Sequence, residues 1–151
     1  MAELRRADLI LHAGDVSNAS VLDQLRSYAP VVAVLGNNDE PALARALPET
    51  TVVEVEAARI GLVHDGGRRA GREARLIARF PGCDAIVYGH SHVPQLERVA
   101  GVWILNPGSP TQRRRAPARS MIVLGVSPKK LRPRLVTFAC ASAGLDARVH
   151  L

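Results

Sequence analysis

Short apolar runs alternate with amphipathic segments along the first two-thirds of the chain. Residues 7–11, 31–35 and 84–88 are almost entirely apolar, which is typical of strands buried on both faces of a parallel sheet. Between these runs, apolar residues recur at helical spacing, and a capping residue or Pro stands near the start of two of the segments. Helices are predicted over residues 17–28, 41–47 and 72–80.

After residue 92 the pattern is one of strands alone, with no convincing helix between them. Parallel βα units followed by antiparallel strands predict an α/β fold, in which two mixed sheets pack face to face with helices outside. We expect one domain over residues 1–138 and a loosely held tail over residues 139–151. The remaining strands are predicted over residues 51–56, 59–63, 95–99, 102–105, 120–126 and 131–138.

The composition adds limits on the class of protein. The apolar fraction of 47% and the charged fraction of 23% are those of a soluble globular protein of one domain. No apolar run approaches the ~20 residues of a membrane span, and the first residues lack the apolar core of a signal peptide. Cys83 and Cys140 form neither a disulfide framework nor a Cys-x-x-Cys pair. We therefore expect a cytoplasmic protein without membrane contacts.

The net charge of +6 favours a phosphate-bearing substrate, although genome composition explains it equally well. Nucleic acid is not excluded as a partner, but an aromatic fraction of 3% leaves few surfaces on which bases stack. The run Arg113-Arg114-Arg115 has two interpretations, steering of phosphate or a solvated face.

Polar side chains follow the predicted strands directly. In open α/β sheets, ligand groups gather beyond the carboxyl ends of the strands. Carboxylate, amide oxygen and imidazole together suit Mn, Fe, Zn, Ni or Co better than Ca. Two such metals would activate a hydroxide between them and neutralise charge on a phosphoryl group. The segments are Gly14-Asp15, Gly36-Asn37-Asn38-Asp39, Val63-His64-Asp65 and Gly89-His90-Ser91-His92.

Each segment alone is a weak signal, because turns and loops use the same residues. Gly-His-Ser-His is more specific, since neighbouring imidazoles usually serve a metal or a proton. Two residues keep two interpretations each. His12 either orients Asp15 or is a buried His without a role, and Asp65 either accepts from a ligand His or caps its loop.

The ordered set of segments resembles the calcineurin-like metallophosphoesterases, in particular the small bacterial phosphodiesterase group. The resemblance runs from about residue 7 to residue 138 and implies the αββα sandwich of that family. It is carried by residues 9–16, 34–39, 61–64 and 87–94, which match the second to fifth blocks of the superfamily, and by residues 105–110, which are typical of the small bacterial members.

The resemblance implies a metal-dependent phosphoesterase that hydrolyses phosphate esters, above all phosphodiesters, through a metal-bound hydroxide. Asp15 would bridge two divalent ions, most simply Mn. Asn37, His64 and His90 would complete the shell of one ion, and His92 would serve the other. The residues assigned to catalysis on this basis are Asp15, Asn38, His64 and His90.

Two departures from the family pattern affect this expectation. Asn38 stands where many members have a His that assists the leaving group. The first block of the family, a strand that ends in Asp-x-His, is absent, because no Asp-x-His occurs in the sequence. We therefore expect an N-terminally truncated domain that lacks the first strand, with one strong metal site, a weak second site and a tendency to form homo-oligomers.

Two functions from different classes remain open at this point. The first is the phosphoesterase, favoured by Asp15, Asn37, His64, His90 and His92. The second is a non-catalytic interaction scaffold on the same fold, like the retromer subunit that resembles these enzymes, and the absent Asp-x-His favours it.

Overall fold

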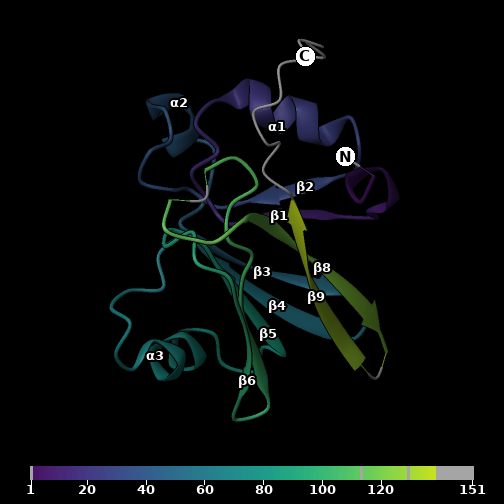
Figure 1. Ribbon diagram of the computed structural model, residues 1–151, viewed down its shortest axis with the longest axis vertical. Coiled ribbons are helices and arrows are strands. Elements are labelled where there is room, and N and C mark those ends of the chain that lie inside the picture. Colours follow the sequence, from purple (N-terminus) through teal and green to yellow (C-terminus); the bar gives the residue numbers. More distant parts are fainter. Residues whose placement is uncertain (1, 113, 129, 139–151) are drawn as a thin grey trace.

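The computed structural model describes residues 2–112, 114–128 and 130–138 (Figure 1). The predicted tail over residues 139–151, which includes Cys140, lies outside the described residues, as does Arg113. In Figure 1, α1 and α2 lie at one end of the molecule and α3 lies at the other, with the strands between them.

The centre of the fold is a five-stranded sheet with the order β3-β4-β5-β7-β6. Its three inner strands run parallel to one another, whereas β3 and β6 pair antiparallel at the two edges. The inner strands are buried on both faces and therefore read as continuous apolar runs, while the edge strands carry exposed charges. The strands are β3 (Thr50–Val55), β4 (Ala58–Val63), β5 (Ala85–Tyr88), β6 (Gln95–Val99) and β7 (Val102–Asn106).

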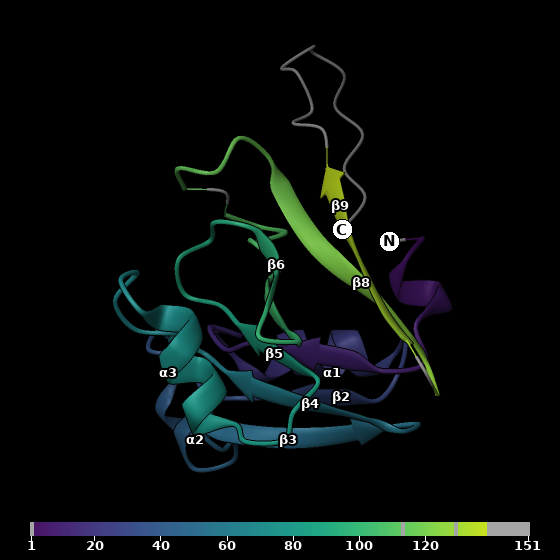
Figure 2. The same cartoon turned by 90° about the horizontal axis from the view of Figure 1, so that it is seen from below.

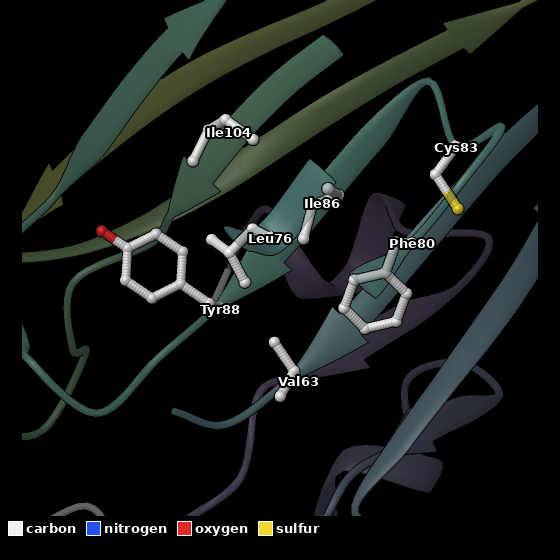
Figure 3. Packing of buried hydrophobic residues seen from close by; sticks show 7 residues of the cluster. All are labelled: Val63, Leu76, Phe80, Cys83, Ile86, Tyr88 and Ile104. Carbon is white, nitrogen blue, oxygen red and sulfur yellow. The ribbon is translucent and has the colours of Figure 1, made fainter. Parts of the chain in front are cut away.

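Helix α3 (Arg72–Arg79) covers one face of this sheet. Figure 3 shows Leu76 and Phe80, from α3 and its end, lying against β4, β5 and β7. Phe80 packs closely because β4 has Gly61 beneath it: a Cβ at that position would lie 2.7 Å from the ring. The core on this face consists of Val63, Leu76, Phe80, Cys83, Ile86, Tyr88 and Ile104.

The opposite face of the sheet is covered by two separate strand pairs. Strand β1 (Ile10–His12) pairs in parallel with β2 (Val31–Ala33), and β8 (Arg119–Ser127) forms an antiparallel hairpin with β9 (Lys130–Phe138). Figure 2 shows the hairpin as a long arm beside the other strands. Side chains from both pairs pack on this face, namely Leu11, Ile122, Leu124 and Leu131 against Ile60, Ala85 and Leu105.

Helices α1 (Ala19–Arg26) and α2 (Pro41–Ala44) pack against β1 and β2 through Leu22 and Leu43. A short 3-10 helix, η1 (Leu4–Arg6), precedes β1.

The predicted α/β class with helices outside the strands is confirmed, and the predicted elements agree with the observed ones to within a few residues at their ends. The second strand layer is built from two pairs, β1-β2 and β8-β9, rather than one ladder. None of the helices among the described residues has the length and apolar character needed to cross a membrane.

A matched pair of substitutions tests the central sheet. Ile86 is fully buried between β4 and β7, whereas Val52 on the edge strand β3 is 40% exposed. We expect Ile86→Ala to lower the free energy of unfolding by about 3 kcal/mol, since it removes packed methyl groups and leaves a cavity. Val52→Ala should cost less than about 1 kcal/mol. Urea denaturation followed by circular dichroism measures both; equal losses would contradict the assigned burial.

Candidate functional site

Four of the predicted site residues meet where β1, β2, β4 and β5 end. Asp15 follows β1, Asn37 follows β2, His64 follows β4 directly and His90 follows β5. The first two residues come from the small parallel pair and the last two from the five-stranded sheet. The site therefore lies between the two strand layers.

The polar atoms of these side chains converge. Asn37 Oδ1 lies 2.9 Å from His64 Nε2 and 2.9 Å from His90 Nδ1. The two imidazole nitrogens are 3.2 Å apart, and Asp15 Oδ1 lies 3.3 Å from His64 Nε2. The rings of His64 and His90 meet edge to face, with centroids 5.2 Å apart. We call Asp15, Asn37, His64 and His90 the Asp–Asn–His cluster.

The hydrogen bonds of His64 determine which of its nitrogens faces this cluster. The carbonyl oxygen of Ala13 lies 2.7 Å from Nδ1, and a carbonyl only accepts, so Nδ1 carries the proton. A neutral His64 then presents the lone pair of Nε2 to the amide oxygen of Asn37, which also only accepts. In that state the two atoms can act together as ligands of one cation, whereas a proton on Nε2 would make the contact an ordinary hydrogen bond to Asn37.

The donor set fits a divalent transition metal. Ligands at roughly 2.1 Å from one ion and at right angles to each other are about 3.0 Å apart, close to the observed separations. In the described part of the chain, no group of three or more His, Cys, Asp and Glu side chains is placed to hold a metal ion. The amide oxygen of Asn37 is needed to complete a set of metal-binding atoms, since this atom contacts both imidazoles.

Asn38 holds the carboxylate of Asp15. Its backbone N–H donates to Oδ1 at 2.9 Å, and its side-chain Nδ2 donates to Oδ2 at 2.7 Å. Partial burial alone would raise the pKa of Asp15. The two hydrogen bonds from Asn38 and the neighbouring imidazoles of His64 and His90 outweigh burial and lower the pKa below its ordinary value. Asp15 is therefore an ionised carboxylate whose two oxygens are both engaged.

Backbone strain is concentrated in the same place. Asp15, His90 and His92 have φ values of 56°, 60° and 57°, in the left-handed region that residues with a Cβ rarely adopt. Such conformations cost on the order of 1–3 kcal/mol each and persist where the surrounding structure enforces them. These conformations set the direction in which each of the three side chains leaves its loop.

Two glycines make the close approach of the layers possible. Gly14 has a φ of 83°, and a Cβ there would lie 2.6 Å from His64 Nδ1. A Cβ on Gly36 would lie 2.0 Å from the backbone nitrogen of Asp15. Gly14 and Gly36 are therefore points at which one part of the site packs directly against another.

Asp39 has a structural role that the sequence pattern did not assign. Its Oδ1 accepts from the backbone N–H of Ser17 at 2.7 Å, and its Oδ2 accepts from that of Gly36 at 2.7 Å. The carboxylate thereby ties the loop after β1 to the loop after β2. The available signal was an Asp in a Gly-Asn-Asn-Asp turn, a residue type that commonly bonds to nearby backbone.

Three other residues singled out from the sequence lie outside the cluster. His92 Nδ1 lies 2.5 Å from the carbonyl oxygen of Gln112. Asp65 accepts the backbone N–H of Gly67 at 2.7 Å, so it caps its own loop. His12 Nδ1 is buried without a hydrogen-bond partner among the described residues, and burial lowers the pKa of this His, which is therefore neutral near pH 7.

An open cavity of about 290 Å³ lies beside the cluster. Asn37 and His64 form part of its wall, which also carries two carboxylates, Glu49 and Asp65, and one guanidinium, Arg79. Arg114 Nη1 lies 3.5 Å from the carbonyl oxygen of His90. Arg114 therefore brings a positive charge close to the cluster.

The sequence matches the family model of the calcineurin-like phosphoesterase superfamily domain over residues 1–129. Because this match covers most of the chain, the protein belongs to the calcineurin-like phosphoesterase superfamily. The family resemblance inferred from the motif residues is thereby confirmed.

Individual relatives agree with this assignment. A probable metallophosphoesterase of Methanocaldococcus jannaschii is 36% identical over 130 residues, which are 84% of this chain and 65% of that protein's length. The structure of wild-type Vps29 from Entamoeba histolytica complexed with Zn²⁺ has a TM-score of 0.72 at 25% identity, covering 91% of this chain and 87% of that one. The structure of an archaeal phosphodiesterase shares the fold, with a TM-score of 0.69 at 20% identity over 87% of this chain and 84% of the other.

Gly14 and Gly101 provide a matched test of the contact between the layers. Both have positive φ, 83° and 86°, but a Cβ on Gly14 would strike His64, whereas a Cβ on Gly101 has nothing within 4 Å. Gly101→Ala should cost only the backbone strain, about 1 kcal/mol. Gly14→Ala should cost a further ~1–3 kcal/mol, because the ring of His64 must move. Urea denaturation measures both variants, and equal costs would contradict the packing of Gly14 against His64.

Proposed function

We propose that this protein is a metal-dependent phosphoesterase that acts on phosphodiesters. The observation that carries the proposal is the convergence of the Asp–Asn–His cluster, in which the amide oxygen of Asn37 lies 2.9 Å from His64 Nε2 and 2.9 Å from His90 Nδ1. A divalent cation coordinated by these atoms would account for their close approach. Membership in the calcineurin-like phosphoesterase superfamily supports a phosphate ester as the substrate.

Asp15, Asn37, His64 and His90 would hold one divalent ion, and Mn²⁺ is the one we favour among the transition metals that suit these ligands. When bound, the ion supplies Lewis acidity toward a phosphoryl oxygen and lowers the pKa of water. A second ion would find only Asp15 and His92 among the predicted ligands, and the hydrogen bond of His92 Nδ1 to Gln112 leaves Nε2 as the nitrogen for it. Two protein ligands hold an ion less tightly than four, so we expect one tightly held ion and a weak second site.

The other residues have roles that follow from their positions. Asn38 keeps the Asp15 carboxylate ionised and in place through two hydrogen bonds, which is a positioning role rather than proton donation to a leaving group. Arg114, beside the carbonyl of His90, would attract the phosphate. The cavity lined by Glu49, Asp65 and Arg79 would receive a substituent of the ester.

A non-catalytic scaffold is the second candidate. The incomplete second ligand set favours it, as does the likeness to Vps29. Metal binding and hydrolysis together separate the two candidates, because the scaffold needs neither. Cytoplasmic location and self-association stay predictions from the sequence, which leaves nucleic acid open as a partner without predicting it.

Metal content tests the site directly. After loading with Mn²⁺ and dialysis, we expect nearer one ion per chain than two, measured by mass spectrometry of the metal. His90→Ala should lose this ion, because it removes a ligand of the cluster, whereas His92→Ala should keep it. Two tightly held ions in the unchanged protein would contradict the one-ion site.

Hydrolysis of bis(4-nitrophenyl) phosphate tests the activity. We expect a weak rate that depends on Mn²⁺, because one ion stabilises the phosphoryl charge less well than two. Asp15→Asn should abolish that rate, since it removes the charge that holds the ion. A protein that binds its ion tightly yet shows no hydrolysis above the rate with Mn²⁺ alone would favour the scaffold.

A further inference from the structure

A buried amide lies directly beneath the Gly-His-Ser-His segment. Asn106 is the last residue of β7, and its exposed fraction is 0%. Because β7 pairs in parallel with β5, with Leu105 opposite Val87, Asn106 is level with the point where β5 ends. A fully buried amide has to satisfy its donors and acceptor within the protein.

Every part of this amide has a partner. Nδ2 donates to the carbonyl oxygen of Gly89 at 2.8 Å and to Ser91 Oγ at 3.1 Å. Oδ1 accepts from the backbone N–H of Gly108 at 2.9 Å. The two acceptors of Nδ2 belong to the residues immediately before and after His90, so one side chain holds His90 from both sides.

The backbone of His90 needs this support. Its φ of 60° lies in the left-handed region, as does the φ of 57° at His92, so two of three consecutive residues have a conformation that L-residues rarely adopt. Such a conformation persists only where neighbouring groups enforce it. The ring of His90 reaches Asn37 and His64 from this conformation.

The residues that follow Asn106 also reach the second His of the segment. Ser109 Oγ accepts the backbone N–H of Gln112 at 3.0 Å, and the carbonyl oxygen of Gln112 is the partner of His92 Nδ1. Ser109 is itself 8% exposed. The turn that begins at Asn106 therefore contacts both His90, through its neighbours, and His92, through Gln112.

We infer, on the basis of the proposed metal site, that Asn106 is a positioning residue that fixes His90 in the Asp–Asn–His cluster through Gly89 and Ser91. It does not touch the cluster itself. It acts by holding the strained backbone so that Nδ1 of His90 stays beside Asn37 and His64. Loss of the amide lets the backbone relax and moves the ring away from the other ligands.

The test compares Asn106→Ala with Ser120→Ala. Ser120 is equally buried at 0%, and its Oγ donates to Pro107 in the same turn at 2.8 Å, but it makes no hydrogen bond to residues 89–92. Both variants remove a buried polar group, so both should lower Tm. Imidazole NMR of the metal-free proteins should show shifted ring signals for His90 in Asn106→Ala and unshifted signals in Ser120→Ala.

Binding of Co²⁺, followed by its visible absorption, provides the second readout. Changes to groups that orient a metal ligand typically weaken binding by 10–100-fold, and we expect a loss of that size in Asn106→Ala. Ser120→Ala should change affinity less than threefold. Equal Tm losses with unshifted His90 signals and unchanged Co²⁺ affinity in both variants would show that Asn106 is structural only, and would overturn the inference.

Two further comparisons decide the question if a variant does not fold or if no metal binds. If Asn106→Ala does not fold, Ser91→Ala removes one acceptor of the same amide and should shift the His90 signals by a smaller amount; no shift would overturn the inference. If the unchanged protein binds no Co²⁺, the proposed function fails. The ring signals of the metal-free proteins then still decide whether Asn106 positions His90.

Discussion

The hydrogen bond from His64 to Ala13 joins the two strand layers at the site. His64 follows β4 of the five-stranded sheet, and Ala13 follows β1 of the small parallel pair. Among the described residues these two sheets share no backbone ladder. Apolar packing and this polar contact therefore hold one sheet against the other. Because Nδ1 is used in this bond, Nε2 has to face Asn37 and Asp15, and the chemistry of the cluster follows from the packing of the layers.

The close approach of the layers also explains the residues around His64. Gly14 and Gly36 have no Cβ that would strike His64 or Asp15. Asp39 ties the loops after β1 and β2 together, so that Asp15 and Asn37 reach the cluster as one unit. The left-handed conformations of Asp15 and His90 accompany the convergence of polar side chains from two sheets at one point, and the buried core stabilises the fold against their energetic cost.

Much of this fold follows from periodicity in the sequence. Residues 85–88 are apolar because β5 is covered on both faces, and a pattern of that kind identifies strands directly. The same pattern does not say which strands are neighbours, so the division of the second layer into β1-β2 and β8-β9 could not be predicted. Burial is a property of one residue, whereas pairing depends on the path of the whole chain.

In the candidate site, too, the sequence predicts some features and leaves others open. Strand ends predicted the meeting of Asp15, Asn37, His64 and His90, since these residues need only follow parallel strands. The contacts of Asn38, Asp39 and His92 depend on loops with φ values that the sequence does not reveal. A His-x-His spacing predicts two imidazoles on one loop, but the carbonyl of Gln112, twenty residues further on, determines where the second one lies.

Asn38 makes the surroundings of the two carboxylate oxygens of Asp15 unequal. Each of these oxygens has two lone pairs, so an oxygen that accepts one hydrogen bond can still make a second polar contact. In this protein Oδ1 of Asp15 lies beside His64 and accepts from the backbone of Asn38, while Oδ2 accepts from the side chain of Asn38. Oδ1 is therefore the oxygen that lies beside another side chain of the cluster, whereas Oδ2 is held by the amide of Asn38. The same amide that helps to keep Asp15 ionised thus orients the carboxylate so that Oδ1 faces His64.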